Sequence, residues 1–229
     1  MFYYIKTLIK NIISNYPNLY YFLIRFKYSK KKYFNLTPNK KTELIIEGYP
    51  RSGNTFFITA LKYTQKRKLN LAHHLHNIAQ IKHGLENKIP VVILLREPKD
   101  AVKSLILREN YQNQTLLLKN YFFFYKFVKK NKEKILIFKF ETIIKNFYKC
   151  IKKINKTFNM NYAIKKLNNN DIKKIFIEID KISKNQKENS TLQSGRPNIY
   201  RKKIKLKLED SIWITKTTQI YKLLKKSAI

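Results

Sequence analysis

The chain has 229 residues, 44% of them hydrophobic, and a formal net charge of +35 at pH 7. This apolar content excludes a disordered chain, and the length suits one domain with a real core. The charge raises nucleic acid or an anionic membrane surface as a partner. Because 42 of the basic residues are Lys and only 7 are Arg, lysines spread over solvated faces explain it better, and we do not expect a nucleic-acid partner.

A single cysteine, Cys150, excludes an intramolecular disulfide and any zinc site built from several cysteines. It falls in a segment of helical pattern, where we expect a core residue. A chain without disulfides is consistent with a reducing compartment. We therefore expect a cytoplasmic protein, with association at the cytoplasmic face of a membrane as an option raised by the N-terminal segment.

Residues 1–26 are apolar and aromatic, but basic residues and a proline interrupt them, so no transmembrane helix is expected. Residues 27–42 are rich in lysine and are interpreted as a linker before an α/β domain at 43–229. The favoured interpretation of the N-terminal helix is packing on that domain, and the alternative is peripheral contact with a membrane surface. The amphipathic pattern places these residues on one helical face: Ile5, Leu8, Ile9, Ile12, Ile13 and Tyr16.

From residue 43 onward, strand patterns alternate with helical patterns. Strands are predicted at 44–47, 69–72, 90–95 and 134–140. Helices are predicted at 55–65, 78–85, 98–106, 115–130, 141–158, 172–182 and 201–226, with a polar surface loop at 184–198. The continuous apolar run at 90–95 is typical of a strand buried on both faces. The alternation predicts an α/β fold with a doubly wound parallel sheet and helices on both of its faces.

A glycine-bearing turn joins the first strand to the first helix of this domain. Gly48, four residues, Gly53, one residue and Thr55 fit the spacing of a nucleotide triphosphate loop. Asn54 stands where that loop requires lysine, and the nearest cation is Arg51. The turn is therefore predicted to bind a phosphate group at a helix N-terminus, in a ligand other than an ordinary triphosphate.

The strand at 90–95 ends on Arg96, followed by Glu97 and Pro98. An enzyme that hydrolyses triphosphates places a carboxylate near this point to hold magnesium. A guanidinium has the wrong charge for magnesium, but it matches the oxygens of a phosphate bound without metal. Packing does not explain Arg96 well, because an unpaired buried guanidinium is costly. No metal is therefore expected, and a nucleotide kinase or NTPase is only the alternative.

Two segments together resemble a known family. Residues 49–56 read Tyr-Pro-Arg-Ser-Gly-Asn-Thr-Phe, and residues 96–104 read Arg-Glu-Pro-Lys-Asp-Ala-Val-Lys-Ser. They are similar to the two signature segments of sulfotransferases that use 3'-phosphoadenosine 5'-phosphosulfate (PAPS), and residues 138–142 extend the resemblance over about residues 43–158. The resemblance implies a P-loop-like sulfotransferase fold, PAPS as co-substrate and transfer of a sulfuryl group to a hydroxyl.

The resemblance assigns the residues of the first segment to the 5' end of the donor. Arg51 takes the place of a family lysine at the phosphosulfate bridge. Phe56 takes the place of a tryptophan that stacks on adenine. Donors to the 5' phosphate would come from Ser52, Gly53, Asn54 and Thr55.

The same resemblance assigns the 3' phosphate to the second segment and to a later arginine. Arg96 and Ser104, eight residues apart as in the family, would bind this phosphate. Arg196, in a Ser-Gly-Arg-Pro turn, matches a later basic position in a different flanking pattern.

The catalytic base is expected among three histidines between the two segments. His74, followed by Leu75, fits the position of the family's catalytic histidine, and His73 and His76 are its rivals. An imidazole that titrates near neutrality suits the removal of a proton from a hydroxyl. Ala72 stands where the family usually has a lysine, which leaves Arg51 to stabilise the leaving group.

Resemblance to compact family members implies that the hydroxyl acceptor is a carbohydrate or a glycolipid. A further alternative, from a different class, is a basic module that binds nucleic acid or a membrane without turnover. Such a module would bind its partner equally well without His74, and its binding would weaken steeply with salt.

Overall fold

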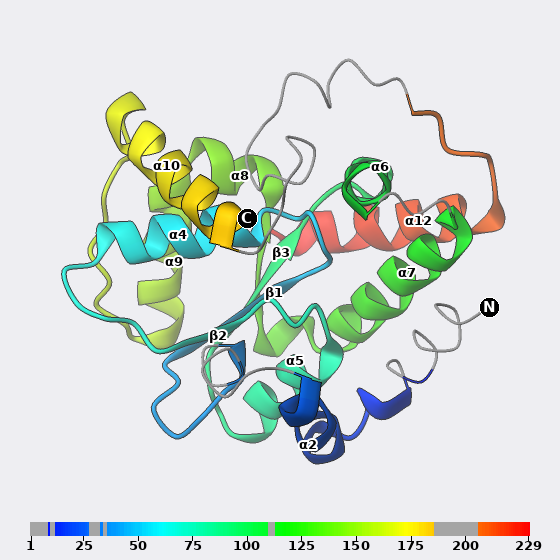
Figure 1. The fold of residues 1–229 in the computed structure, drawn as a ribbon, viewed down its shortest axis with the longest axis horizontal. Helices are drawn as coiled ribbons and strands as arrows, with labels where there is room; N and C mark the ends of the chain where they lie inside the picture. The colour runs from blue at the N-terminus through cyan, green and yellow to red at the C-terminus, as the bar shows by residue number, and fades with distance from the viewer. Residues whose placement is uncertain (1–8, 10–11, 28–32, 34–35, 110–112, 186–205) are drawn as a thin grey trace.

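The computed structural model describes residues 9, 12–27, 33, 36–109, 113–185 and 206–229. Its centre is a four-stranded sheet in the order β2-β1-β3-β4, with every neighbouring pair parallel (Figure 1). The strands are β1 (Leu44–Gly48), β2 (Leu71–His73), β3 (Val91–Leu95) and β4 (Leu136–Lys139). Ile46 pairs with His73 of β2 on one side and with Val92 of β3 on the other, which brings the carboxyl ends of these strands to one edge.

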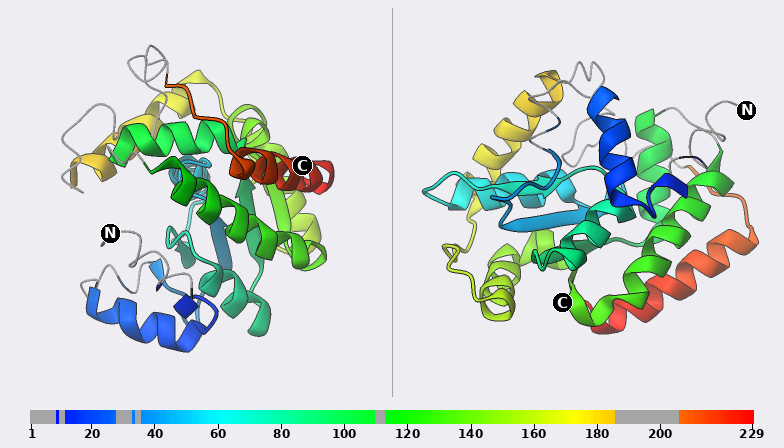
Figure 2. Two further views of the ribbon diagram at one scale, coloured as in Figure 1. Left: turned by 90° about the vertical axis from the view of Figure 1, so that its right-hand side faces the viewer. Right: turned by 90° about the horizontal axis from the view of Figure 1, so that it is seen from below.

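Helices cover both faces of the sheet, so the doubly wound α/β prediction is confirmed (Figures 1 and 2). One face packs on α4 (Asn54–Thr64), α9 (Phe147–Phe158) and α10 (Asn169–Asn185). The other face packs on α5 (Ile78–Glu86), α6 (Pro98–Glu109), α7 (Gln114–Lys130) and α12 (Ile212–Ser227). Shorter pieces flank β4: a 3-10 turn at Lys132–Lys134 and α8 (Phe140–Lys145).

The strand residues alternate between these two cores, as a pleated sheet requires. Ile45, Val91 and Ile93 belong to the core beneath α6, α7 and α12. Leu44 and Val92 belong to the core beneath α4, α9 and α10. Since both faces are buried, the strands are mostly apolar, and β3 is apolar at every position; Glu47 at the end of β1 and His73 at the end of β2 are the buried polar exceptions.

Several boundaries differ from the sequence expectations for local reasons. The helix expected at 141–158 is two helices, α8 and α9, that meet at Asn146. The terminal helix begins at Ile212, and of the residues before it only 206–211 are described, without helix. The N-terminal helix is interrupted at 14–16, and α2 (Pro17–Lys27) begins with a proline, whose fixed φ and missing N–H suit the first helical position.

The N-terminal helix α2 packs on α5 through one face only. Tyr20, Tyr21 and Ile24 form a small core with Leu75 and Ala79. The packed residues are not those of the predicted apolar face: Ile13 is partly buried against this small core, but Ile9, Ile12 and Tyr16 are exposed, so the expected packing face is wrong at these three positions. No described helix is long and apolar enough to cross a membrane.

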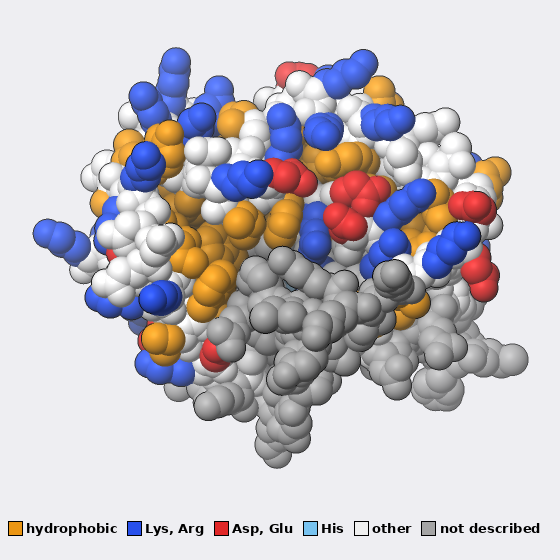
Figure 3. Space-filling model, turned by 90° about the horizontal axis from the view of Figure 1, so that it is seen from above, with side chains coloured by type: hydrophobic (Ala, Val, Ile, Leu, Met, Phe, Trp, Pro, Cys, Tyr) orange, Lys and Arg blue, Asp and Glu red, His pale blue; other side chains and the backbone are white. Residues whose placement is uncertain are grey.

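Charged side chains are spread over the described part of one face of the molecule. On the face shown in Figure 3, lysines and arginines are dispersed among apolar, acidic and uncharged groups instead of forming one patch. This distribution agrees with lysines on solvated faces.

Candidate active site

Three segments singled out in the sequence follow neighbouring strands and therefore meet at one edge of the sheet. Residues 49–53 follow β1, residues 74–76 follow β2, and Arg96 follows β3. The crevice beyond the carboxyl ends of parallel strands is where α/β proteins bind ligands. The topology thus explains why residues far apart in the sequence form one site.

The turn after β1 requires both of its glycines. A Cβ on Gly48 would lie 2.7 Å from the carbonyl oxygen of Leu94, which is backbone and cannot move aside. Gly53 has φ 92° and precedes α4, and a Cβ there would lie 3.1 Å from the ring of Phe140. Arg51 also has a left-handed backbone, with φ 70°, a strained conformation that is typical of binding sites.

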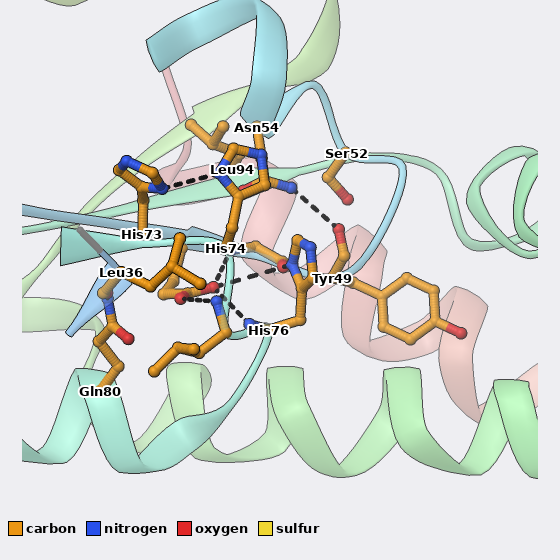
Figure 4. A network of polar contacts seen from close by, with 12 residues as sticks. Leu36, Tyr49, Ser52, Asn54, His73, His74, His76, Gln80 and Leu94 are labelled. Atoms are coloured by element: carbon orange, nitrogen blue, oxygen red, sulfur yellow. Dashed lines mark hydrogen bonds and ion pairs between the residues drawn. The ribbon is translucent and has the colours of Figure 1, made fainter. Parts of the chain in front are cut away.

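Two side chains expected to contact the ligand are turned inward beneath this loop. Asn54 is 3% exposed, and its Nδ2 donates to the carbonyl of Tyr49 at 3.3 Å (Figure 4). The Ser52 hydroxyl is fully buried, 3.5 Å from the hydroxyl of Tyr125. Tyr125 in turn donates to the carbonyl of Leu94 at 2.6 Å. These side chains hold the shape of the loop, so any direct role in binding falls to its backbone.

Residues 49–56 and 96–104 contact each other through their arginines. Arg51 Nε donates to the Ser104 hydroxyl at 3.0 Å, and Arg96 Nη1 donates to the Arg51 carbonyl at 2.8 Å. The Arg96 guanidinium lies over the ring of Phe140, 4.4 Å from its centre. Burial lowers the pKa of Arg96 from its ordinary value, although the group stays a cation near neutrality. Arg51, Arg96 and Ser104 therefore form one cationic cluster beside the loop.

One donor of this cluster has no partner. Arg96 Nε is buried and has no hydrogen bond within the described part of the chain. A buried donor without a partner is costly, and such a group in a folded protein calls for an explanation. An anion that accepts a hydrogen bond from Arg96 Nε would supply this explanation.

Phe56, which was expected to stack on adenine, is buried against another helix. Phe56 is 4% exposed, and its ring centre lies 6.1 Å from that of Phe176 on α10. Stacking on adenine would require α10 to move, so that role stays a prediction. Arg196 lies outside the described residues.

A buried carboxylate, which sequence reasoning missed, holds the histidine segment in place. Glu47 is fully buried at the end of β1 and accepts from the backbone N–H groups of Leu75, at 2.9 Å, and His76, at 3.0 Å (Figure 4). His76 Nδ1 lies 2.7 Å from the Gly48 carbonyl, so this nitrogen carries the proton that it donates. His76 therefore has a structural contact to the turn after β1.

His74 lies between the phosphate loop and His73. Its Nε2 lies 3.2 Å from the Thr55 hydroxyl, in the first turn of α4. Its Nδ1 lies 2.8 Å from the Nδ1 of His73, a residue that is 9% exposed. Burial lowers the pKa of His74 to about 4 and that of His73 well below its ordinary value. Both rings are therefore neutral near pH 7. His74 differs here from the expected imidazole that titrates near neutrality: it is free to accept a proton at pH 7, but it is a weaker base.

Two cations that sequence reasoning missed act on His74. After burial, Lys62 and then Arg108 lower the pKa of His74 electrostatically. Lys62 is the one charged residue of α4, which is a signal that the sequence did contain.

A cavity of about 530 Å³ opens next to the loop and the histidine segment. The turn after β1 and the histidine segment contribute Tyr49, Pro50 and His76, and the N-terminal segment contributes Ile12. The opposite wall is α7, with the aromatic side chains of Phe123, Phe124 and Phe127 and the ammonium groups of Lys126 and Lys130. The cavity thus combines apolar walls with a few polar and cationic groups, as sites for organic ligands do.

Among the residues that the structure describes, no group of three or more His, Cys, Asp or Glu side chains could hold a metal ion. The site consists of backbone, guanidinium, imidazole and hydroxyl groups.

No protein-family model matches the chain, and no curated protein matches it either. Among solved structures, the chain is similar to the mouse sulfotransferase SULT7A1 complexed with PAP, at 15% sequence identity and a TM-score of 0.40. The similarity covers 63% of this chain and 66% of the mouse chain, slightly less than two thirds of that protein's length. A likeness this distant carries no information on activity, so the function has to be argued from the site.

Proposed function

We propose that this protein is a sulfotransferase that moves a sulfuryl group from PAPS to a hydroxyl acceptor. The observation that carries the proposal is the cluster in which Arg51 contacts Ser104 and Arg96 contacts Arg51, with a neutral imidazole, His74, on the adjoining segment. The cluster offers cations for two phosphate groups without a metal, and the imidazole offers a base.

The residues present fit such a donor. The glycine turn leaves its backbone open at the N-terminus of α4, where anions are favoured by the helix dipole. Arg96 keeps a buried Nε without a partner among the described residues, as expected of a group that binds an anion. Arg51 and the α4 turn would hold the 5' end, and Arg96 and Ser104 the 3' phosphate. When bound, PAPS supplies the activated sulfuryl group.

His74 is proposed as the general base. Its neutral ring can accept the proton of the acceptor hydroxyl as the new bond to sulfur forms. The contact to His73 orients the His74 ring, and the Thr55 hydroxyl lies at hydrogen-bond distance from His74 Nε2. Arg51 is proposed to stabilise the charge that develops on the leaving phosphate, assisted by the field of Lys62.

The cavity supports a glycolipid as the acceptor. Its wall of Phe123, Phe124 and Phe127 suits an apolar body or the face of a sugar, while Lys126 and Lys130 suit polar or anionic groups. A free carbohydrate would leave much of the apolar wall without a partner. Pro50 and His76 line this cavity, so an acceptor bound in it would lie next to the phosphate loop.

The discriminating experiment is thermal unfolding of the purified chain with 3',5'-ADP or with ATP and magnesium. We expect stabilisation by 3',5'-ADP of about 2.7 kcal/mol at a hundredfold excess over its Kd. Preference for ATP with magnesium would falsify the proposal and support a nucleotide kinase or NTPase. Transfer from isotope-labelled PAPS to glycolipids is the direct assay, with free sugars as the comparison.

Substitution of His74 separates an enzyme from a basic binding module. His74→Ala should leave 3',5'-ADP binding intact and lower transfer by about 10²–10⁴-fold, the usual contribution of a general base. A non-catalytic module would show no transfer in either form, and its partner binding would be insensitive to His74.

A further inference from the structure

The N-terminal helix α2 carries a second apolar face that nothing in the described structure covers. Four side chains point to solvent at the spacing i, i+3, i+4 and i+7, which places them on one stripe: Leu19 (46% exposed), Phe22 (59%), Leu23 (41%) and Phe26 (76%). The opposite face, with Tyr20, Tyr21 and Ile24, is already buried against α5. The helix is therefore apolar on both sides, which a helix facing water is not.

The stripe continues toward the cavity beside the phosphate loop. Two further exposed apolar side chains precede α2: Tyr16 (63%), in the interruption at 14–16, and Ile12 (64%), before it. Ile12 also lines the cavity. A contiguous exposed apolar surface of this kind marks an interaction site. We call the residues Ile12, Tyr16, Leu19, Phe22, Leu23 and Phe26 the α2 stripe.

The charge of the sequence segment that contains the α2 stripe points to its partner. Residues 1–42 contain nine Lys or Arg side chains and no Asp or Glu. On α2 itself, Arg25 and Lys27 are exposed in the last turn, next to Phe26. A basic helix with exposed aromatic and aliphatic side chains matches an anionic lipid surface, where the rings enter the interface and the cations meet the headgroups.

The length of α2 decides between lying on a bilayer and crossing it. Eleven residues span about 16 Å, whereas the hydrocarbon core is about 30 Å thick. The helix is also fixed along its other face to α5, at one end of the molecule (Figure 1). We propose that the α2 stripe docks this protein peripherally on an anionic membrane. The docking does not depend on sulfuryl transfer, although it would bring a lipid acceptor to the cavity.

The test is co-sedimentation with vesicles of phosphatidylcholine, alone or mixed equally with phosphatidylglycerol. The wild-type chain should bind the mixed vesicles, and Phe22→Ser with Phe26→Ser should weaken binding at least about tenfold, since each ring loses its burial in the interface. Arg25→Gln with Lys27→Gln should weaken it about fivefold or more on the mixed vesicles and leave binding to pure phosphatidylcholine unchanged.

The matched control is Ile177→Ser with Ile212→Ser, which removes two comparably exposed side chains, 54% and 64%, from α10 and α12. This control should bind like wild type. All substituted residues are exposed, so far-ultraviolet circular dichroism should be unchanged and a loss of fold would be visible.

Two results would overturn the docking. Vesicle binding that survives the Phe22 and Phe26 substitutions but disappears in salt would show attraction by net charge alone. Self-association of the wild-type chain without vesicle binding, abolished by the same substitutions in analytical ultracentrifugation, would assign the stripe to a second copy. Failure of docking would leave the 3',5'-ADP titration unaffected, so the two proposals fail separately.

Discussion

The Nδ1 atoms of His73 and His74 lie 2.8 Å apart, so one ring donates a hydrogen bond to the other. If His74 donates, its Nε2 keeps a lone pair and accepts from Thr55, which is the form that a base requires. If His73 donates, Nε2 of His74 carries a proton and cannot accept another. His73 is thus placed to select the tautomer of His74, and under the proposed function, with His74 as the base, it would act through that ring.

Removing the His73 contact should therefore lower turnover through orientation. We expect His73→Leu to reduce kcat about tenfold to a hundredfold, because the tautomer and orientation of His74 are no longer selected. His73→Asn keeps a polar group that can donate or accept and should restore part of the rate. The measurement is kcat at saturating donor, with ¹⁵N chemical shifts of the imidazoles reporting the tautomer. Equal rates for the two variants would show that only the packing of His73 matters.

Arg96 should require its guanidinium and not only its charge. Arg96→Lys keeps the cation but loses the planar fork that contacts the Arg51 carbonyl and offers Nε to a ligand. We expect affinity for 3',5'-ADP to fall about tenfold to a hundredfold, or about 1.4–2.7 kcal/mol. Isothermal titration calorimetry measures the loss.

The matched control for Arg96 is Arg67→Lys. Arg67 is an exposed arginine that pairs with Glu43 and lies away from the loop. Its replacement should leave 3',5'-ADP affinity unchanged. If Arg96→Lys binds like wild type, the assignment of a phosphate to Arg96 fails, whatever the effect on stability.

Glu47 should be more important for stability than its place in an apolar strand suggests. In Glu47→Gln, an amide NH₂ replaces one of two oxygens that accept from Leu75 and His76, so a backbone donor loses its partner. We expect a loss of about 1–3 kcal/mol in the free energy of unfolding, measured in urea. Glu43→Gln, at a partly exposed position at the start of the domain, serves as the comparison and should cost less. A smaller effect at Glu47 than at Glu43 would contradict the role of this carboxylate in holding the segment 74–76.

Much of the fold was predictable because its signals are local. The run of β3 and the first three residues of β1 are apolar because helices bury both faces of the sheet. The break between α8 and α9 at Asn146 was not visible, since the apolar period continues across it. The early end of the N-terminal helix could have been predicted from Pro17, which favours a helix start over a helix interior.

The candidate site was likewise predictable only in part. The glycine turn, Arg96 and His74 each follow a strand that the sequence predicted, and the order of the strands, which the structure shows, brings them to one edge. The support beneath the loop comes from Tyr125, which lies 76 residues from Tyr49 in the chain and has no local pattern of its own. The burial of Phe56 by Phe176 likewise depends on how α10 packs, which periodicity does not reveal.

The neutral histidines also predict how stability varies with pH. The folded state lowers the pKa of His74 to about 4 from an ordinary value of 6.5, and His73 shifts in the same direction. The unfolded chain therefore binds more protons than the folded one between about pH 6.5 and pH 4. The free energy of unfolding should therefore be highest above this pH window and should fall as the pH drops through it.

This fall should be smaller in His74→Gln, which cannot take up the proton in either state. We expect the difference between wild type and variant to reach about 2 kcal/mol at pH 4, less than the full shift implies because His74 is partly exposed. Urea unfolding at pH 7, 5.5 and 4 measures it. His83→Gln, on α5, provides the comparison, since burial lowers the pKa of His83 as well and this residue is not part of the proposed site. Parallel curves for wild type and His74→Gln would show that His74 is not held neutral by the fold.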